Sequence, residues 1–100
     1  MFGTIATMKV KSGQADALKA DMERWTRERG RAVKGFVSAT IYRSVDDPNE
    51  LMMAVVFDSK ENYMANAESP EQDAEYRKML EFLDSEPKWA DGDIIAHMTA

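Results

Sequence analysis

Apolar and polar residues alternate from residue 2 to residue 10, a pattern that predicts an opening β-strand with one buried face. The positions expected on that face are Phe2, Thr4, Ala6, Met8 and Val10. From residue 14 to residue 29 the apolar positions recur every three or four residues, which is the spacing of one helix face. These positions are Ala15, Leu18, Met22 and Trp25. Gly30 is expected to end this helix.

Two strands are predicted in the middle of the chain, at residues 36–44 and 51–57. Residues 46–50 between them (Asp-Asp-Pro-Asn-Glu) have turn chemistry and predict a hairpin. The second of these strands is apolar throughout, as expected for a central strand covered on both faces. Strict alternation in the first divides its side chains between two faces. One face would hold Val37, Ala39 and Ile41, and the other Phe36, Ser38, Thr40 and Tyr42.

A second helical region is predicted from Ser59, with a break and a new start at residues 69–72 (Ser-Pro-Glu-Gln). This segment offers a capping serine, a proline at the first helical position and a glutamine two residues later. The apolar stripe of the new helix consists of Tyr76, Met79, Leu80 and Leu83. Residues 86–88 should end it, residues 91–93 (Asp-Gly-Asp) are expected to form a turn, and residues 94–99 a last strand.

The predicted order is β-α-β-β-α-β within residues 1–100, treated as a single domain. It indicates an α+β, ferredoxin-like fold, in which a four-stranded antiparallel sheet carries its helices on one face. The other face of the sheet would then lack a covering layer. A second copy of the chain is the simplest cover, so we expect a homodimer that pairs through the sheet face.

Composition narrows the class of partner. The formal net charge is -5 and the sequence pI is about 4.8, which argues against binding to nucleic acid. There is no cysteine, so disulfides and thiolate metal sites are excluded. No apolar run approaches the roughly 20 residues needed to span a bilayer, and no signal peptide is visible. A cytoplasmic protein without a membrane partner is the expectation.

Three segments resemble the antibiotic biosynthesis monooxygenase-like family of dimeric α+β barrels. They are Gly-Phe-Val-Ser-Ala at residues 35–39, Phe-Asp-Ser-Lys-Glu-Asn-Tyr at residues 57–63, and Glu-Tyr-Arg at residues 75–77. The resemblance covers most of the chain and implies a pocket between the sheet and the helices. The same barrel hosts quinone-forming monooxygenases, haem degraders and muconolactone isomerases, so the resemblance predicts fold more sharply than chemistry.

The monooxygenase branch of that family uses a strand Trp, a nearby Asn, a helix Tyr and an Arg on the last helix. Phe57 stands where the Trp would be, and Met53 stands where the Asn would be. Tyr63 matches the Tyr, and Arg77 is the match for the Arg. The resemblance therefore implies that Tyr63 donates a hydrogen bond to a substrate oxygen and that Arg77 stabilises a substrate anion. The competing interpretations are a packing tyrosine and a surface ion pair between Arg77 and Asp73.

The haem-degrading branch needs an Asn on the first strand and Trp and His in the second helical region. Ala6, Asn66 and Tyr76 occupy those positions, so haem degradation of that type is not expected. His97, the sole imidazole, is predicted to lie on the last strand, where it is a candidate general base or a structural residue. With one histidine and no cysteine, no metal ligand set is predicted.

The leading hypothesis is a cofactor-independent monooxygenase acting on an aromatic polyketide-like or quinol substrate, which would itself supply the electrons for dioxygen. Tyr63, Arg77 and His97 are the candidate catalytic residues. The residues expected to contact a small apolar or aromatic ligand are Phe57, Met53, Trp25, Tyr76 and Asn66. Two alternatives stay open. One is a non-catalytic ligand-binding or stress-related dimer, and the other is an isomerase or decarboxylase that uses His97.

Overall fold

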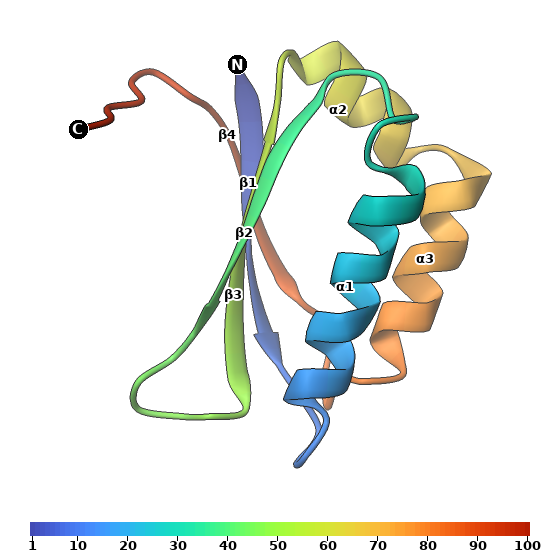
Figure 1. Ribbon diagram of the computed structural model, residues 1–100, viewed down its shortest axis with the longest axis vertical. Helices are drawn as coiled ribbons and strands as arrows, with labels where there is room; N and C mark the ends of the chain where they lie inside the picture. The colour runs from blue at the N-terminus through green and yellow to red at the C-terminus, as the bar shows by residue number, and fades with distance from the viewer.

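An antiparallel sheet of four strands, in the order β2-β3-β1-β4, carries all of the helices on one face (Figure 1). The computed structural model describes residues 1–100. The strands are β1 (Phe2–Lys9), β2 (Phe36–Arg43), β3 (Glu50–Phe57) and β4 (Lys88–Asp93). The helices are α1 (Ala15–Arg29), α2 (Lys60–Ala67) and α3 (Pro70–Leu80). The predicted α+β ferredoxin-like fold is confirmed.

The starts of α2 and α3 follow from their capping residues. The Ser59 and Ser69 hydroxyls accept hydrogen bonds from the backbone N–H groups of Asn62 and Gln72, as side-chain caps do at helix starts. Pro70 occupies the first position of α3, where its lack of a backbone N–H costs no hydrogen bond within the helix. The predicted new start at residue 69 is therefore confirmed. None of the three helices has the length and apolarity needed to cross a lipid bilayer.

The prediction for the last strand is wrong. Strand β4 spans Lys88–Asp93 and includes the Asp-Gly-Asp segment that was expected to turn, while residues 94–100 continue without regular secondary structure. All six residues of β4 are exposed, and the strand pairs only with β1, at the edge of the sheet. An edge strand held by backbone hydrogen bonds needs no alternating apolar pattern, so its sequence resembles a loop.

The predicted faces of β2 are also corrected. A β-bulge lies between Phe36 and Ser38, so Phe36 pairs with Phe57 while Ala39 pairs with Val55. Because paired residues in an antiparallel sheet point to the same side, Phe36 joins Ala39 on the face that the helices cover. Val37 is the extra residue of the bulge, so the alternation of side chains between the two faces is interrupted there.

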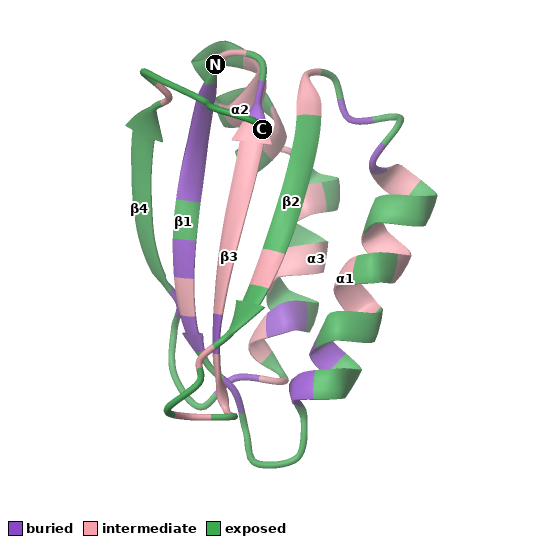
Figure 2. Ribbon diagram, turned by 60° about the vertical axis from the view of Figure 1, so that its left-hand side comes forward, coloured by how far each residue is buried: buried purple, intermediate pink, exposed green.

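The interior has two packed ends. At one end, the core consists of Met8, Val10, Ala15, Leu18, Leu51, Met79 and Leu83. Strand β1 supplies much of the buried surface, whereas β2 and β4 are largely exposed (Figure 2). At the other end, beneath α2, an aromatic cluster consists of Phe2, Trp25, Phe36, Phe57 and Tyr63. Gly35, which comes directly before Phe36 in the sequence, has a φ of 84°. A Cβ at this position would collide with the side chains of Asp58 and Asn62.

Candidate functional site

A cavity of about 810 Å³ lies between the inner face of the sheet and the helices. Its floor is one row across the sheet, in which Asp91, Thr4, Val55 and Ala39 are paired from β4 to β2. Three of these side chains, those of Thr4, Val55 and Ala39, are short, so they fill little of the space between the sheet and the helices. Val55 and Met53 on the central strand are only partly buried as a result.

The aromatic cluster closes one end of this cavity. Ring centroids are 5.2 Å apart between Trp25 and Phe36, 5.8 Å between Phe36 and Phe57, and 5.6 Å between Phe57 and Tyr63, all with edge-to-face tilts. Phe57 at the centre is only 2% exposed. Such pairs are favourable and fix the ring orientations. The cavity therefore has a rigid aromatic wall suited to a flat, largely apolar ligand.

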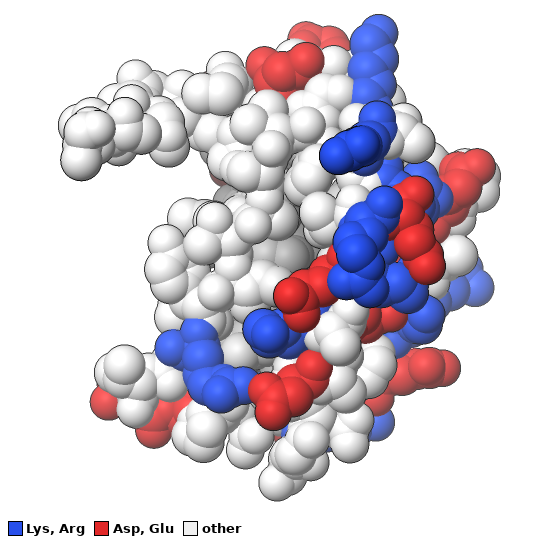
Figure 3. All heavy atoms as spheres, viewed as in Figure 1, with Lys and Arg blue, Asp and Glu red and all other residues white.

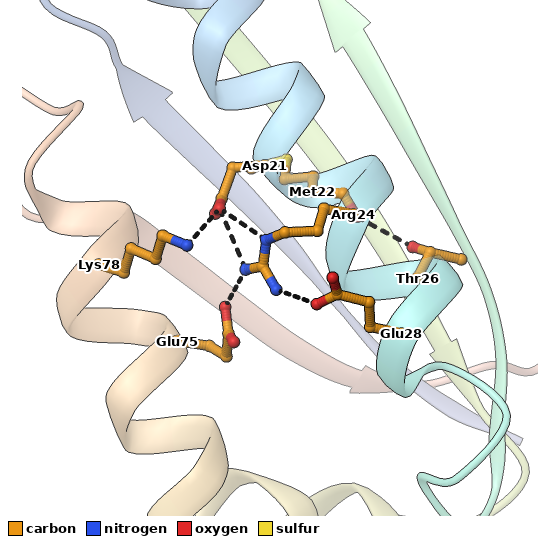
Figure 4. A network of polar contacts seen from close by, with 7 residues as sticks. All are labelled: Asp21, Met22, Arg24, Thr26, Glu28, Glu75 and Lys78. Carbon is orange, nitrogen blue, oxygen red and sulfur yellow. Dashed lines mark hydrogen bonds and ion pairs between the residues drawn. The ribbon is translucent and has the colours of Figure 1, made fainter.

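A group of ion pairs, here called the helix clasp, joins the two helices that roof the cavity (Figure 4). Arg24 of α1 donates to Glu75 of α3 and to Glu28 at 2.7 Å each, and to Asp21 at 3.1 Å. Lys78 of α3 lies 3.3 Å from Asp21. Hydrogen bonds from Arg24 to Glu28, Glu75 and Asp21 raise the pKa of its guanidinium above the usual range, so the charge is permanent. The clasp fixes the spacing of α1 and α3.

One group of polar side chains in the cavity surrounds Tyr63, whose hydroxyl donates to Asp91 Oδ1 at 3.1 Å. Burial is the main cause that raises the pKa of Tyr63 above its ordinary value, and the Asp91 carboxylate adds to it. Thr4 lies within reach of the phenol and opposes the shift, yet its hydroxyl has no partner with acceptable hydrogen-bond geometry. Thr4, Tyr63 and Asp91 are called the polar cluster below.

Three buried polar atoms have no hydrogen-bond partner, and all belong to residues that line the cavity. They are Thr4 Oγ1, Trp25 Nε1 and Gln72 Oε1. A buried polar group without a partner is costly, and such groups are rare in folded proteins. The three atoms are themselves covered by neighbouring protein atoms, so they are unsatisfied groups in the wall of the cavity.

All five residues predicted to contact a ligand, and one of the three candidate catalytic residues, lie around the same cavity. Phe57, Met53, Trp25, Tyr76, Asn66 and Tyr63 all line the cavity. Arg77 does not, because its side chain is 76% exposed on α3 and pairs with Asp73 at 3.0 Å. His97 lies in the segment after β4, and not on a strand, so it is not part of this cavity either.

Sequence reasoning missed Asp91 and Gln72 as cavity residues, and it treated Thr4 only as part of a buried face. Asp91 was assigned to a turn, so the register that sets it beside Thr4 was not considered. Trp89 packs near Tyr76, with ring centroids 6.4 Å apart. A threonine among apolar residues on a buried face was the one available signal, since a buried hydroxyl requires a partner.

The outer surfaces differ in charge. Lys, Arg, Asp and Glu side chains gather over the helices, while the side of the sheet facing away from them is mostly uncharged and hollowed (Figure 3). Ile5 and Tyr42 on that free face are 57% and 56% exposed. No group of three or more His, Asp or Glu side chains is arranged to hold a metal ion.

Comparison with known proteins gives a family and a set of similar folds. The family described as antibiotic biosynthesis monooxygenase matches residues 1–78. No curated protein sequence matches the chain. Among solved structures, a variant of SnoaB, a cofactor-independent oxygenase from Streptomyces nogalater, is 13% identical with a TM-score of 0.82, covering 99% of this chain and 97% of that one.

Two further structures show the same fold. Rv0793 from Mycobacterium tuberculosis is 19% identical with a TM-score of 0.79, and 98% of each chain is covered. A conserved protein from Methanosarcina mazei is 15% identical with a TM-score of 0.78, with 91% of this chain and 89% of that chain covered. At these identities the likeness establishes the fold and leaves the substrate open.

Proposed function

The chain belongs to the antibiotic biosynthesis monooxygenase family, and we propose that it is a cofactor-independent monooxygenase acting on an aromatic polyketide-like or quinol substrate. The observation that carries the proposal is the cavity of about 810 Å³, which joins an aromatic wall to the Tyr63 hydroxyl and the Asp91 carboxylate. The fold shared with SnoaB, which is described as a cofactor-independent oxygenase, supports it.

The dimensions of the cavity suit a substrate of two or three fused rings. Ligand sites for molecules of that size occupy about 300–1,000 Å³ and combine apolar walls with a few polar groups. Phe36, Phe57 and Trp25 provide the wall, and Tyr63 provides a polar contact at one end. A flat hydroxylated ring would satisfy both features, whereas a flexible charged metabolite would leave the aromatic surface uncovered.

The reaction balances without an added reductant. In an anthrone-type substrate, the two hydrogens of a ring methylene group leave with one atom of dioxygen as water, and the other oxygen atom becomes a ring carbonyl. The electrons come from the substrate, which must first ionise. The protein then has to exclude bulk water, hold the ring flat and contact the ionising oxygen, which are roles for the aromatic wall and for Tyr63.

We further propose that the chain acts as a homodimer that pairs through the free face of the sheet. That face is mostly uncharged, and it exposes Ile5 and Tyr42 by more than half. Exposed apolar surface of this kind is typical of a protein interface. A second copy would cover it without touching the helix side, so the cavity would remain in each protomer.

Oxygen uptake with dithranol, a trihydroxyanthracene, tests the proposed function. The protein is dialysed against chelator, and wild type is compared with Tyr63→Phe. The matched control is Tyr42→Phe, which removes the same hydroxyl from the free face of the sheet and keeps the ring. Because that face is the proposed dimer interface, gel filtration first verifies that this variant has the assembly state of wild type. We expect uptake well above the spontaneous rate, lowered about tenfold in Tyr63→Phe and unchanged in the control.

The alternative outcomes have separate meanings. If wild type adds nothing to the spontaneous rate, this chemistry is refuted for trihydroxyanthracenes, and the ligand-binding alternative takes its place. If wild type is active and Tyr63→Phe is equally active, the monooxygenase stands but the phenol of Tyr63 has no part in it.

A further inference from the structure

We propose that the edge of the cavity beside β4 binds an alkylated ammonium group, such as a trimethylammonium or protonated dimethylamino substituent on the ligand. Tyr76, Trp89 and Asp91 form this site, here called the cation site. It goes beyond the proposed function, because it recognises the charge on a ligand and has no part in the oxidation of a ring. The body of such a ligand would lie deeper in the cavity.

Asp91, a member of the polar cluster, is the one carboxylate of the cavity that has no cation beside it. Five carboxylates line the cavity, and four of them pair with Lys or Arg at 2.7–3.4 Å, namely Asp21, Glu23, Asp73 and Glu75. Asp91 forms no ion pair, and its carboxylate accepts one side-chain hydrogen bond, from the Tyr63 hydroxyl to Oδ1. Oδ2 is left without a partner, so this negative charge is free to attract a cation.

The chain places no cation of its own at this edge of the cavity. Arg27 is the one Lys or Arg among the lining residues, and it belongs to α1. Helix α1 lies on the side of β2, whereas β4 is the opposite edge of the sheet (Figure 2). Lys88 precedes Trp89 on β4, so its side chain points to the other face. A cation at the cation site must therefore come from a ligand.

Two aromatic rings stand beside the Asp91 carboxylate. Trp89 and Asp91 pair with Ala6 and Thr4, so both point to the helix side, about 7 Å apart along β4. The Tyr76 ring of α3 has its centroid 6.4 Å from that of Trp89, and the two planes are inclined at 49°. A cation is attracted to an aromatic face within about 6 Å of its centroid. Trp89 is 44% exposed, so a group entering at this edge can reach both rings.

The composition of the site favours an alkylated ammonium group over a small inorganic cation. A divalent metal ion needs several oxygen ligands, and no group of three or more His, Asp or Glu side chains is arranged to provide them. A trimethylammonium group spreads its charge over methyl groups, which pack against aromatic faces. One carboxylate oxygen and two rings match that group.

NMR titration with choline and with its uncharged isostere, 3,3-dimethylbutan-1-ol, tests the proposal. The two probes have the same shape, because a carbon atom replaces the charged nitrogen. Backbone amide shifts give both the dissociation constants and the place of binding, and sodium chloride keeps the ionic strength constant throughout. We expect wild type to prefer choline about tenfold, with the largest shifts at Trp89 and Asp91.

Two variants separate the charge from the ring. Asp91→Asn keeps the shape of the side chain and removes its charge, so the preference should fall at least threefold. Asp93→Asn is the matched control, since it removes the same charge from the same strand outside the cavity and should keep the wild-type preference. Trp89→Leu should also lower the preference at least threefold at unchanged net charge, whereas Trp89→Phe keeps an aromatic face and should retain most of it. The amide spectra show that each variant is folded.

Equal affinities in wild type, no measurable binding of choline, or shifts away from β4 would overturn the proposal. A preference that survives in Asp91→Asn or in Trp89→Leu, or one that Asp93→Asn lowers as much as Asp91→Asn does, would overturn it as well. None of these results depends on oxygen uptake. A chain that prefers choline but consumes no oxygen with dithranol would refute the proposed monooxygenase and leave the cation site standing. A chain that consumes oxygen but binds both probes equally would do the opposite.

Discussion

Two methionines on the inner face of the sheet allow the division between packed core and open cavity to be tested with one substitution. Met8 on β1 is 0% exposed and belongs to the core. Met53 on β3 is only partly buried and lines the cavity. Changing each to alanine removes the same atoms from the same face of the sheet, so the difference between the two variants reports on their surroundings.

The two costs should differ clearly. Met8→Ala removes buried contacts and leaves a new void, which lowers the free energy of unfolding by about 3 kcal/mol. Met53→Ala enlarges a space that is already open, so it loses contacts on one side only and should cost about 1 kcal/mol. With a urea dependence of about 1.5 kcal/mol per molar, the midpoints should fall by about 2 M and by less than 1 M.

The measurement is urea unfolding followed by circular dichroism. All three proteins are held at one concentration, because a dimer makes stability depend on concentration. The urea dependence must be the same in each for the midpoints to be compared. Equal losses in the two variants, or a larger loss in Met53→Ala, would refute the reasoning. Either result would mean that the helices close onto Met53 in solution and that the cavity is not open there.

Two further predictions concern the helix clasp and the phenol. Arg24→Met should lower the free energy of unfolding by about 1–2 kcal/mol, since it leaves Glu75 and its neighbours without their cation, and molar salt should narrow the gap to wild type in urea titrations. Absorbance titration should show Tyr63 ionising above the usual pKa near 10, and Asp91→Ala should lower that pKa. Because the folded chain holds this proton more tightly than the unfolded chain, its contribution to stability is intact below about pH 10 and is lost as pH rises through the raised pKa. The urea midpoints of wild type and Tyr63→Phe should therefore approach each other as the pH rises through the raised pKa of Tyr63.

The sequence was sufficient for most elements because their physical signals are local. The apolar alternation of residues 2–10 and the helical spacing of Ala15, Leu18 and Met22 both correspond to surfaces that become buried or partly buried. The restart of the helix at Ser69 and Pro70 is also a local signal, set by a hydroxyl cap and a proline ring. Each signal needs only a few neighbouring residues.

The last strand failed because its stability comes from β1 rather than from its own sequence. Lys88–Asp93 is exposed and contains two aspartates. The strand was predicted at residues 94–99 because the apolar residues lie there. Ile95 is 96% exposed, and beyond the hydrogen bond from the Ile94 N–H to the Met1 carbonyl the segment with the better strand pattern pairs with no strand of the chain. The same error hid Asp91, since a residue assigned to a turn was never placed opposite Thr4. The position of the last strand is set by its pairing with β1, which a local sequence pattern does not reveal.

The bulge in β2 has a consequence for how distant sequences are compared. Val37 is the additional residue between two regular pairs, Phe36 with Phe57 and Ser38 with Val56. A related chain lacking a counterpart of Val37 would continue the same pairing, and every other side chain of the strand would keep its face. A one-residue gap in an alignment at this point therefore does not signal a different cavity. An alignment that assumes strict alternation along β2 would place Phe36 on the wrong face of the sheet.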